Sequence, residues 1–396
     1  MNAVGIDVSK GKSTVAVMQP VAFCRRRPCR RLCCDGANFL FAPLGVVAAS
    51  PFEVNHTEDE LHELAKLLKS FSGETKVVME YTGNYYEPIA RYLRSEGLFV
   101  CVVNEILIHN YGGNSVRKAK TDKKDSVRIA CYALDRWLDL VEYVPADDIR
   151  STLKLLNRQY TAACKHKTQL KNNFISLIDQ SFPGVNKLFK SSARLSDGHE
   201  KWVDFVIKFP HCDCVSGISR SAFKDKYSRW CKKEHYRYIE AKADELYDYA
   251  GTIIAALSNS ECIRTMIEQT ANQLNCACET VSTIRKCMTE TAEQLPEYDT
   301  VIGMYGVGEV LAPQLMAEIG DTRRFHNRKA ITAFAGLDAS PYQSGMIDIK
   351  SRRISKRGSS HLRKTLFQVI DVILKTSLFT DFSTRNALRA RHTKCI

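Results

Sequence analysis

The sequence contains no run of about 18 consecutive apolar residues, which a membrane-spanning helix would require. Its first residues, MNAVGIDVSKGK, lack the basic start and the long apolar stretch of a secretory signal peptide. Acidic residues are in deficit, with 44 Asp and Glu against 57 Lys and Arg, and the formal net charge is +13. We therefore expect a cytoplasmic protein without membrane contact. The positive charge favours a polyanionic partner, because each neutralised phosphate releases counterions.

Cysteine is abundant, with 15 residues, but disulfide scaffolds belong to short secreted chains, so these thiols should stay reduced. We expect most of them to pack as small apolar side chains, including the cluster of Cys212, Cys214, Cys231 and His235. A composition of 44% hydrophobic and 26% charged residues is typical of globular proteins, and 396 residues allow two or three domains.

Short apolar runs alternate with helical patterns in residues 1–148, the first predicted domain. VGIDV at 4–8 and STVAV at 13–17 predict a β-hairpin. The remaining predicted elements are a strand at 46–54, a helix at 56–71, a strand at 76–80, a helix at 86–96, a strand at 98–104 and a helix at 122–138. Strands that flank a helix favour a right-handed parallel crossover, so the prediction is a mixed α/β sheet with an antiparallel hairpin at its edge.

Residues 19–45 interrupt this pattern between two predicted strands. The segment contains five Arg and four Cys, and the adjacent Cys33 and Cys34 lack the paired spacing of a zinc site. We interpret it as an inserted surface loop or a sequence artefact without a catalytic role.

Two stretches in the predicted second domain, 149–296, repeat apolar residues at alternating steps of three and four. They occupy 151–179 and 263–288 and predict paired coiled-coil helices, packed together or against a second subunit. Residues 183–240, between them, show no clean period and receive no assignment.

The predicted third domain, 297–396, is mainly helical. Gly303, Gly306 and Gly308 precede an apolar helix and resemble a helix-hairpin-helix element whose backbone N–H groups hold a phosphate. A plain helix-turn-helix packing unit is the alternative, and the basic segment at 349–364 favours the phosphate-binding interpretation.

Acidic residues stand in positions where an isolated charge would be costly. Asp7 lies within an apolar strand and Glu80 at the end of another, so each needs a partner or a cation. Asp122 and Asp125 are three apart on one face of the later helix. Together the four match a two-metal layout for attack on phosphodiesters, although each alone is consistent with an ordinary surface acid. The lysines around the helical pair are Lys120, Lys123 and Lys124.

Three separated motifs carry a resemblance to a known family: GIDVSK at 5–10, MEYTGNYYEP at 79–88 and VRKAKTDKKDSVRIACYA at 116–133. In this order they resemble the RuvC-like, RNase H-fold domain of DEDD transposases from bacterial insertion sequences of family one-ten. Residues 302–345 and ISKRGSSHLRKTL at 354–366 resemble the C-terminal transposase domain of that family.

The resemblance implies a nucleoid-associated bacterial recombinase that cuts and rejoins double-stranded DNA at element ends and target, guided by a structured bridge RNA, as a dimer or tetramer. It further implies that Asp7, Glu80, Asp122 and Asp125 bind Mg²⁺, with Mn²⁺ as an alternative, and that Ser344 attacks the scissile phosphate. Next to this serine, we expect phosphate contacts from a basic stretch. Its members are Arg352, Arg353, Lys356, Arg357, Arg363 and Lys364.

Two other interpretations remain open. A structure-specific RuvC-like nuclease would use metal-bound water in place of the serine, and a catalytically inactive relative would only bind nucleic acid.

Overall fold

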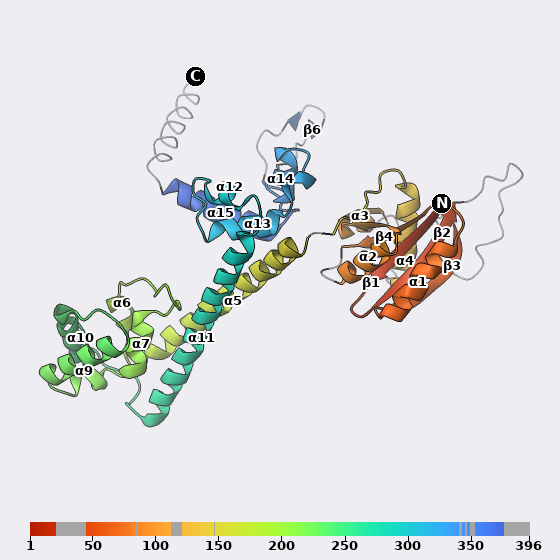
Figure 1. The fold of residues 1–396 in the computed structure, drawn as a ribbon. Helices are drawn as coiled ribbons and strands as arrows, with labels where there is room; N and C mark the ends of the chain where they lie inside the picture. Colours follow the sequence, from red (N-terminus) through yellow and green to blue (C-terminus); the bar gives the residue numbers. More distant parts are fainter. Residues whose placement is uncertain are drawn as a thin grey trace, which may run out of the picture. The chain divides into compact units, whose positions relative to one another are not determined.

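The computed structural model describes residues 1–20, 45–81, 83, 85–111, 121–145, 147–339, 343–344, 347–348 and 353–375 (Figure 1). The chain forms two compact units, Met1–Pro145 and Ala146–Ile396. The predicted division into three domains stays a prediction. Among the described helices, none has the length and apolarity needed to cross a membrane.

The first unit is built on a five-stranded sheet with the order β3-β2-β1-β4-β5. The hairpin β1–β2 and the pair β2–β3 are antiparallel, whereas β4 and β5 run parallel to β1. This topology confirms the predicted mixed α/β sheet and fits an RNase H-like domain. The strands are β1 (Asn2–Val8), β2 (Lys12–Pro20), β3 (Gly45–Asn55), β4 (Thr75–Glu80) and β5 (Phe99–Val103).

Helices cover both faces of this sheet. Side chains alternate between the two faces along each strand, so the apolar strands offer core residues to both. Val4, Ile6 and Val8 pack in the core under α1 and α2, whereas Ala3 faces the opposite core under α3 and α4. The α3 helix was not predicted, and α4 ends earlier than expected. The helices are α1 (Glu58–Ser70), α2 (Tyr86–Ser95), α3 (Glu105–Tyr111) and α4 (Asp122–Asp135).

The segment 21–44 lies outside the described residues, but its two attachment points are informative. Pro20 and Gly45 stand opposite each other in the β2–β3 pair. Because the strands are already in register there, a short turn is enough to connect them. This geometry supports the interpretation of an insertion into a hairpin.

Replacing residues 21–44 with Asn-Gly should therefore leave the fold intact. We expect the free energy of unfolding to stay the same or to rise by up to about 2 kcal/mol, because a shorter loop loses less entropy on closure. Thermal unfolding of the full chain measures this. Loss of cooperative unfolding in the shortened protein would show that the segment belongs to the core.

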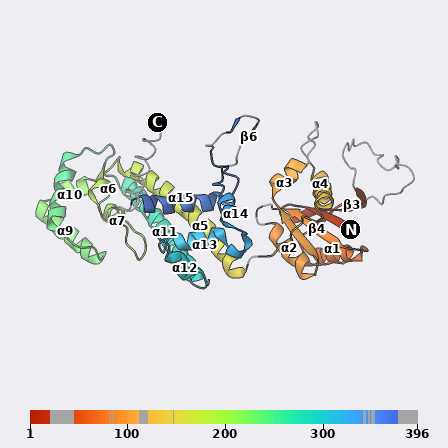
Figure 2. The same cartoon turned by 90° about the horizontal axis from the view of Figure 1, so that it is seen from above.

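The second unit contains two long helices, α5 (Asp148–Ile178) and α11 (Glu261–Ala292), which pack against each other (Figures 1 and 2). Leu153 and Phe174 of the predicted α5 stripe are buried, as are Ile267 and Leu274 of α11. The paired helices are thus present as predicted. Whether they supercoil stays a prediction.

Between these helices the chain forms a helical unit around an aromatic core. Phe205, Tyr227 and Trp230 are buried within it, with ring centroids 5.6–6.0 Å apart. The sequence of this segment shows no clean apolar period because its helices are short and buried on more than one side. They are α6 (Val185–Leu188), α7 (Lys201–Lys208), α8 (Asp213–Ser216), α9 (Arg220–Lys233) and α10 (Glu240–Thr252).

Cys212 and Cys231 are buried, in agreement with the expected packing role. In the described part of the chain, His211, Cys212 and Asp213 have the mutual distances of a metal site. However, Nδ1 of His211 accepts a hydrogen bond from the Asp213 backbone N–H (3.1 Å), and Nε2 lies 2.9 Å from the Leu257 carbonyl. Both ring nitrogens therefore have structural partners.

The end of the described chain is mainly helical, as predicted. Its elements are α12 (Tyr298–Ile302), α13 (Leu311–Ile319), the 3₁₀ helix η1 (Thr322–Arg324), α14 (Arg328–Phe334), the paired strands β6 (Gln343–Ser344) and β7 (Ile347–Asp348), and α15 (Ser360–Leu374).

Candidate metal centre

The acids predicted on two strands lie side by side at the carboxyl ends of the neighbouring strands β1 and β4. Ile6 of β1 pairs with Met79 of β4 in a parallel register, so the next residues, Asp7 and Glu80, are neighbours. Both occupy the face that α4 covers, because Ala3 and Val78, an even number of residues earlier, contact that helix layer. Ligands of open α/β sheets bind beyond the carboxyl ends of such strands.

Gly5 brings α4 close to these strand ends. A Cβ atom on Gly5 would lie 2.1 Å from the carbonyl oxygen of Ser126 and 2.4 Å from the backbone nitrogen of Ala130. The absent side chain thus lets α4 rest directly on β1, two residues before Asp7. Asp125 precedes Ser126 on that helix, so this contact places the Asp125 carboxylate near the acids of the strands.

A Gly5→Ala substitution should push α4 away from β1, since backbone atoms on both sides leave no flexible neighbour to yield. We expect a loss of about 3 kcal/mol in unfolding free energy, the upper range for overpacking, and weaker divalent-metal binding. Denaturant titration measures the first effect. Gly251→Ala is the matched control, because no atom lies within 4 Å of its Cβ position, and it should be neutral or stabilising. Equal stability of the Gly5 variant and wild type would contradict the close packing.

The charges of the three acids act on one another. Burial, followed by the negative charges of Asp7, Asp125 and Glu105, raises the pKa of Glu80 from 4.5 to about 7, and the positive charge of Arg128 opposes the shift. Arg128 also forms an ion pair with Asp125, with 3.2 Å between Nη1 and Oδ1. The acids from β1, β4 and α4 therefore form one cluster.

Glu105 and Arg128 are members of this cluster that the sequence analysis missed. Glu105 begins α3 directly beyond β5, and Arg128 stands one turn after Asp125 on α4. Their positions relative to the end of a parallel strand and to the predicted acid pair would have identified them.

Asp122 is the first residue of α4 and is exposed, one turn before Asp125. Thr121 caps the helix, and its hydroxyl accepts the Lys124 backbone N–H at 3.4 Å. Lys123 is exposed beside them. The predicted Lys120 lies outside the described residues.

The chemistry of this donor set suits a divalent cation, although in this structure the three carboxylates do not all lie within 4.8 Å of one another. Burial, together with the negative charges of Asp7 and Asp125, raises the pKa of Glu80 to about 7, and a hard cation with a preference for carboxylate oxygen offsets both the burial of the charge and the repulsion. Asp7, Glu80 and Asp125 would hold such a cation, with Asp122 within one helical turn.

The shift at Glu80 predicts an unusual pH dependence. Folding raises its pKa from 4.5 to about 7, so the folded protein retains a proton that the unfolded chain releases, and stability falls as pH rises through this window. In EDTA, the melting temperature should fall between pH 5 and 8, and Mg²⁺ should restore it at pH 8. Glu80→Gln should remove much of this dependence. An unchanged pH profile in that variant would contradict the assignment.

The C-terminal predictions fall in the second unit. Ser344 pairs with Ile347 across the two short strands, and Arg352 lies outside the described residues. Nη1 of Arg363 donates a hydrogen bond to the Ala335 carbonyl at 2.9 Å, so part of this guanidinium stabilises the end of α14. The other described cations of the segment are exposed. They are Arg353, Lys356, Arg357 and Lys364.

The glycine turn before α13 has a partly structural explanation. Gly306 has a φ of 80°, and a Cβ atom there would lie 2.5 Å from Cγ1 of Ile373. The N–H groups of Leu311 and Ala312 both donate to the Gly308 carbonyl, and the next residue, Pro313, has no N–H. Residues 311–313 therefore have no N–H group available for the phosphate contact predicted at this hairpin.

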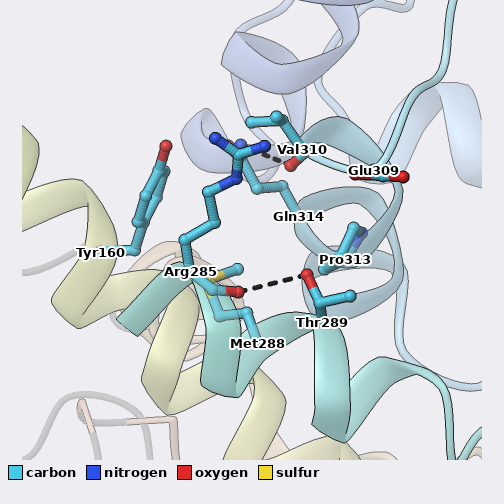
Figure 3. Close-up of a pocket in the computed structure, with 8 residues that line it drawn as sticks. All are labelled: Tyr160, Arg285, Met288, Thr289, Glu309, Val310, Pro313 and Gln314. Carbon is cyan, nitrogen blue, oxygen red and sulfur yellow. Dashed lines mark hydrogen bonds between the residues drawn. The ribbon is translucent and has the colours of Figure 1, made fainter. Parts of the chain in front are cut away.

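Figure 3 shows a small pocket beside this turn. Tyr160 of α5 and Arg285 of α11 line it together with Glu309, and Nε2 of Gln314 donates to the Val310 carbonyl at 2.9 Å. The turn thus packs beside the two long helices.

The mixed sheet and its converging carboxylates define a carboxylate-centred α/β domain of the RNase H type. Comparison with known families extends this: residues 43–183 match a transposase family of the DEDD type typified by IS110, and residues 299–383 match the transposase family of IS116, IS110 and IS902. The chain belongs to this insertion-sequence transposase family. Glu80, Asp122 and Asp125 lie within the first match and Ser344 within the second, whereas Asp7 precedes both.

Individual proteins with similar sequences include a gene-inverting protein and a protein of an insertion element. A pilin gene-inverting protein of Moraxella bovis is 20% identical over 291 residues, which cover 74% of this chain and 65% of that protein. An insertion element IS116 protein of Streptomyces clavuligerus is 21% identical over 275 residues, 69% of this chain and 66% of its own. The chain thus spans about two thirds of these relatives. The RuvC structure of Thermus thermophilus, 12% identical, aligns over 36% of this chain and 100% of its own with a TM-score of 0.25.

Proposed function

We propose that this protein is a DNA transposase that cuts and rejoins strands at the ends of its element and at a target. The observation that carries the proposal is the convergence of Asp7, Glu80 and Asp125 at the ends of parallel strands, in a chain of a transposase family. Such a cluster suits phosphoryl transfer, in which a metal stabilises charge on the attacked phosphate.

In this proposal, Asp7, Glu80, Asp122 and Asp125 bind Mg²⁺, for which Mn²⁺ can substitute. When bound, the metal supplies Lewis-acid activation of the phosphodiester. The carboxylates fix its place at the strand ends and offset its charge. Arg128, already paired with Asp125, holds that carboxylate on the inward side of α4.

Ser344 is the proposed nucleophile. Its hydroxyl gives up a proton as the bond from Oγ to phosphorus forms, while the bond from phosphorus to the leaving strand oxygen breaks and that oxygen takes up a proton. A phosphoserine link retains the phosphodiester bond energy, so a second strand end can reverse the reaction and join. A nuclease that uses water would release this energy.

The partners in this proposal are double-stranded DNA and a structured bridge RNA, bound by a dimer or tetramer of the chain. The exposed cations of the segment 353–364, together with Lys120, Lys123 and Lys124, supply phosphate contacts.

The test is incubation of the full-length protein with element-end DNA, Mg²⁺ and RNA transcribed from the flanking sequence. Denaturing gels would resolve both cut strands and protein linked to DNA. A covalent adduct that requires Mg²⁺ supports the serine recombinase. Metal-dependent cutting without an adduct would replace it with a water-using nuclease, and binding without cutting would indicate an inactive relative.

A further inference from the structure

A buried carboxylate joins three helices of the second unit. The side chain of Glu318, on α13, is 1% exposed. It accepts hydrogen bonds from Nδ2 of Asn157 (2.8 Å) and Nη2 of Arg158 (2.9 Å) on α5, and from the hydroxyl of Ser359 (3.1 Å). With three donors, this acid is fully engaged inside the protein.

Ser359 is also the N-cap of α15, because its hydroxyl accepts the Leu362 backbone N–H at 3.1 Å. Glu318 therefore fixes the beginning of α15 against the N-terminal third of α5. Figure 2 shows α15 and α5 in the same part of the second unit.

This contact gathers positive charge from both helices. Burial lowers the pKa of His361, and the charges of Arg158, Lys364 and Lys165 lower it further against the opposing effect of Glu318. Lys165 lies two helical turns after Arg158 on α5, and Lys364 lies one turn after His361 on α15. Cations from segments far apart in sequence thus surround one point.

Two of these charges, those of Lys165 and Lys364, are not neutralised within the part of the chain that the structure describes. Lys165 and Lys364 are exposed, and neither forms an ion pair with another described residue. The nearby Glu318 carboxylate is buried and already bound to Arg158. The N-terminal end of α15 adds the positive end of a helix dipole. An exposed surface with this surplus attracts a polyanion.

We propose that Arg158, Lys165 and Lys364, which surround His361, form one α5–α15 cationic surface that binds the sugar–phosphate backbone of a nucleic acid. This inference rests on the proposed function and adds α5 to its predicted contacts, so that the backbone continues from the segment 353–364 onto the long helix. DNA and RNA share the phosphodiester that such a surface recognises.

The test compares a double variant, Lys165→Gln with Lys364→Gln, with a control pair, Lys233→Gln with Lys286→Gln. The control lysines, on α9 and α11, are 83% and 79% exposed, and both variants lose the same charge. Fluorescence anisotropy would follow binding of an element-end DNA duplex and of the flanking RNA to full-length protein between about 50 and 200 mM salt.

We expect the plot of log affinity against log salt concentration to become less steep for the surface variant, its slope changing by about 2, and to keep its slope for the control. A change with DNA alone or RNA alone identifies the ligand. Equal slopes in wild type and surface variant overturn the inference while leaving the proposed function intact, and so does an equal change in the control. No binding by wild type overturns both.

Discussion

An Asp7→Asn variant should lose metal-dependent strand cleavage by more than about 100-fold while remaining folded. Changes to groups that only orient metal ligands cost roughly 10- to 100-fold, so the loss of a direct ligand should exceed that range. Asn keeps the size of the side chain but removes one negative charge from the cluster around Glu80. The metal-free variant should therefore be at least as stable as wild type at pH 8, because repulsion decreases.

Cleavage of element-end DNA and thermal unfolding with and without Mg²⁺ measure these two effects. Asp139→Asn is the matched control. The Asp139 side chain is 71% exposed and pairs with Arg136, and the residue lies beyond the C-terminal end of α4, whereas Asp125 lies near its N-terminal end. It should retain full cleavage. An Asp7→Asn protein that cuts DNA at the wild-type rate would exclude Asp7 from the metal centre.

A Ser344→Ala variant should form no covalent protein–DNA adduct and should lose strand cleavage and joining entirely. The reason is chemical, since alanine has no oxygen with which to attack phosphorus. Mg²⁺ binding should persist, because the metal ligands of the proposal belong to the first unit. The measurement is denaturing electrophoresis of protein with labelled DNA, scored for an adduct and for cut strands.

Ser340→Ala is the control for this experiment, because it removes a neighbouring hydroxyl from the same stretch of sequence. It should form the adduct as wild type does. If Ser344→Ala still cuts DNA without an adduct, water is the nucleophile. If Ser340→Ala alone abolishes the adduct, the nucleophile has been assigned to the wrong serine.

The sequence was sufficient to predict the acid cluster because strand geometry is regular. Asp7 and Glu80 lie at or next to the last residues of two apolar runs, and neighbouring parallel strands bring such ends together. The spacing of Asp122 and Asp125 likewise required only the helical repeat. The close approach of α4 at Gly5 was not predictable, because it depends on packing across the sheet.

Other features were missed for physical reasons. Glu105 and Arg128 influence Glu80 through space, so they are recognised only from their positions just beyond β5 and one turn after Asp125. The core around Phe205 and Tyr227 is built from short helices with aromatic residues on several sides, so its apolar residues have no single period. The contact of Glu318 with α5 and α15 joins positions up to 161 residues apart, which one sequence does not reveal.

In the proposed function, the acids of β1, β4 and α4 form one divalent-metal site. Isothermal titration of Mn²⁺ into metal-free, full-length protein in the absence of nucleic acid tests it most directly. We predict saturable binding by wild type and by Asp139→Asn, and strongly weakened binding by Asp7→Asn, by Glu80→Gln and by Asp125→Asn. Equal affinity of wild type and all three cluster variants would contradict the account.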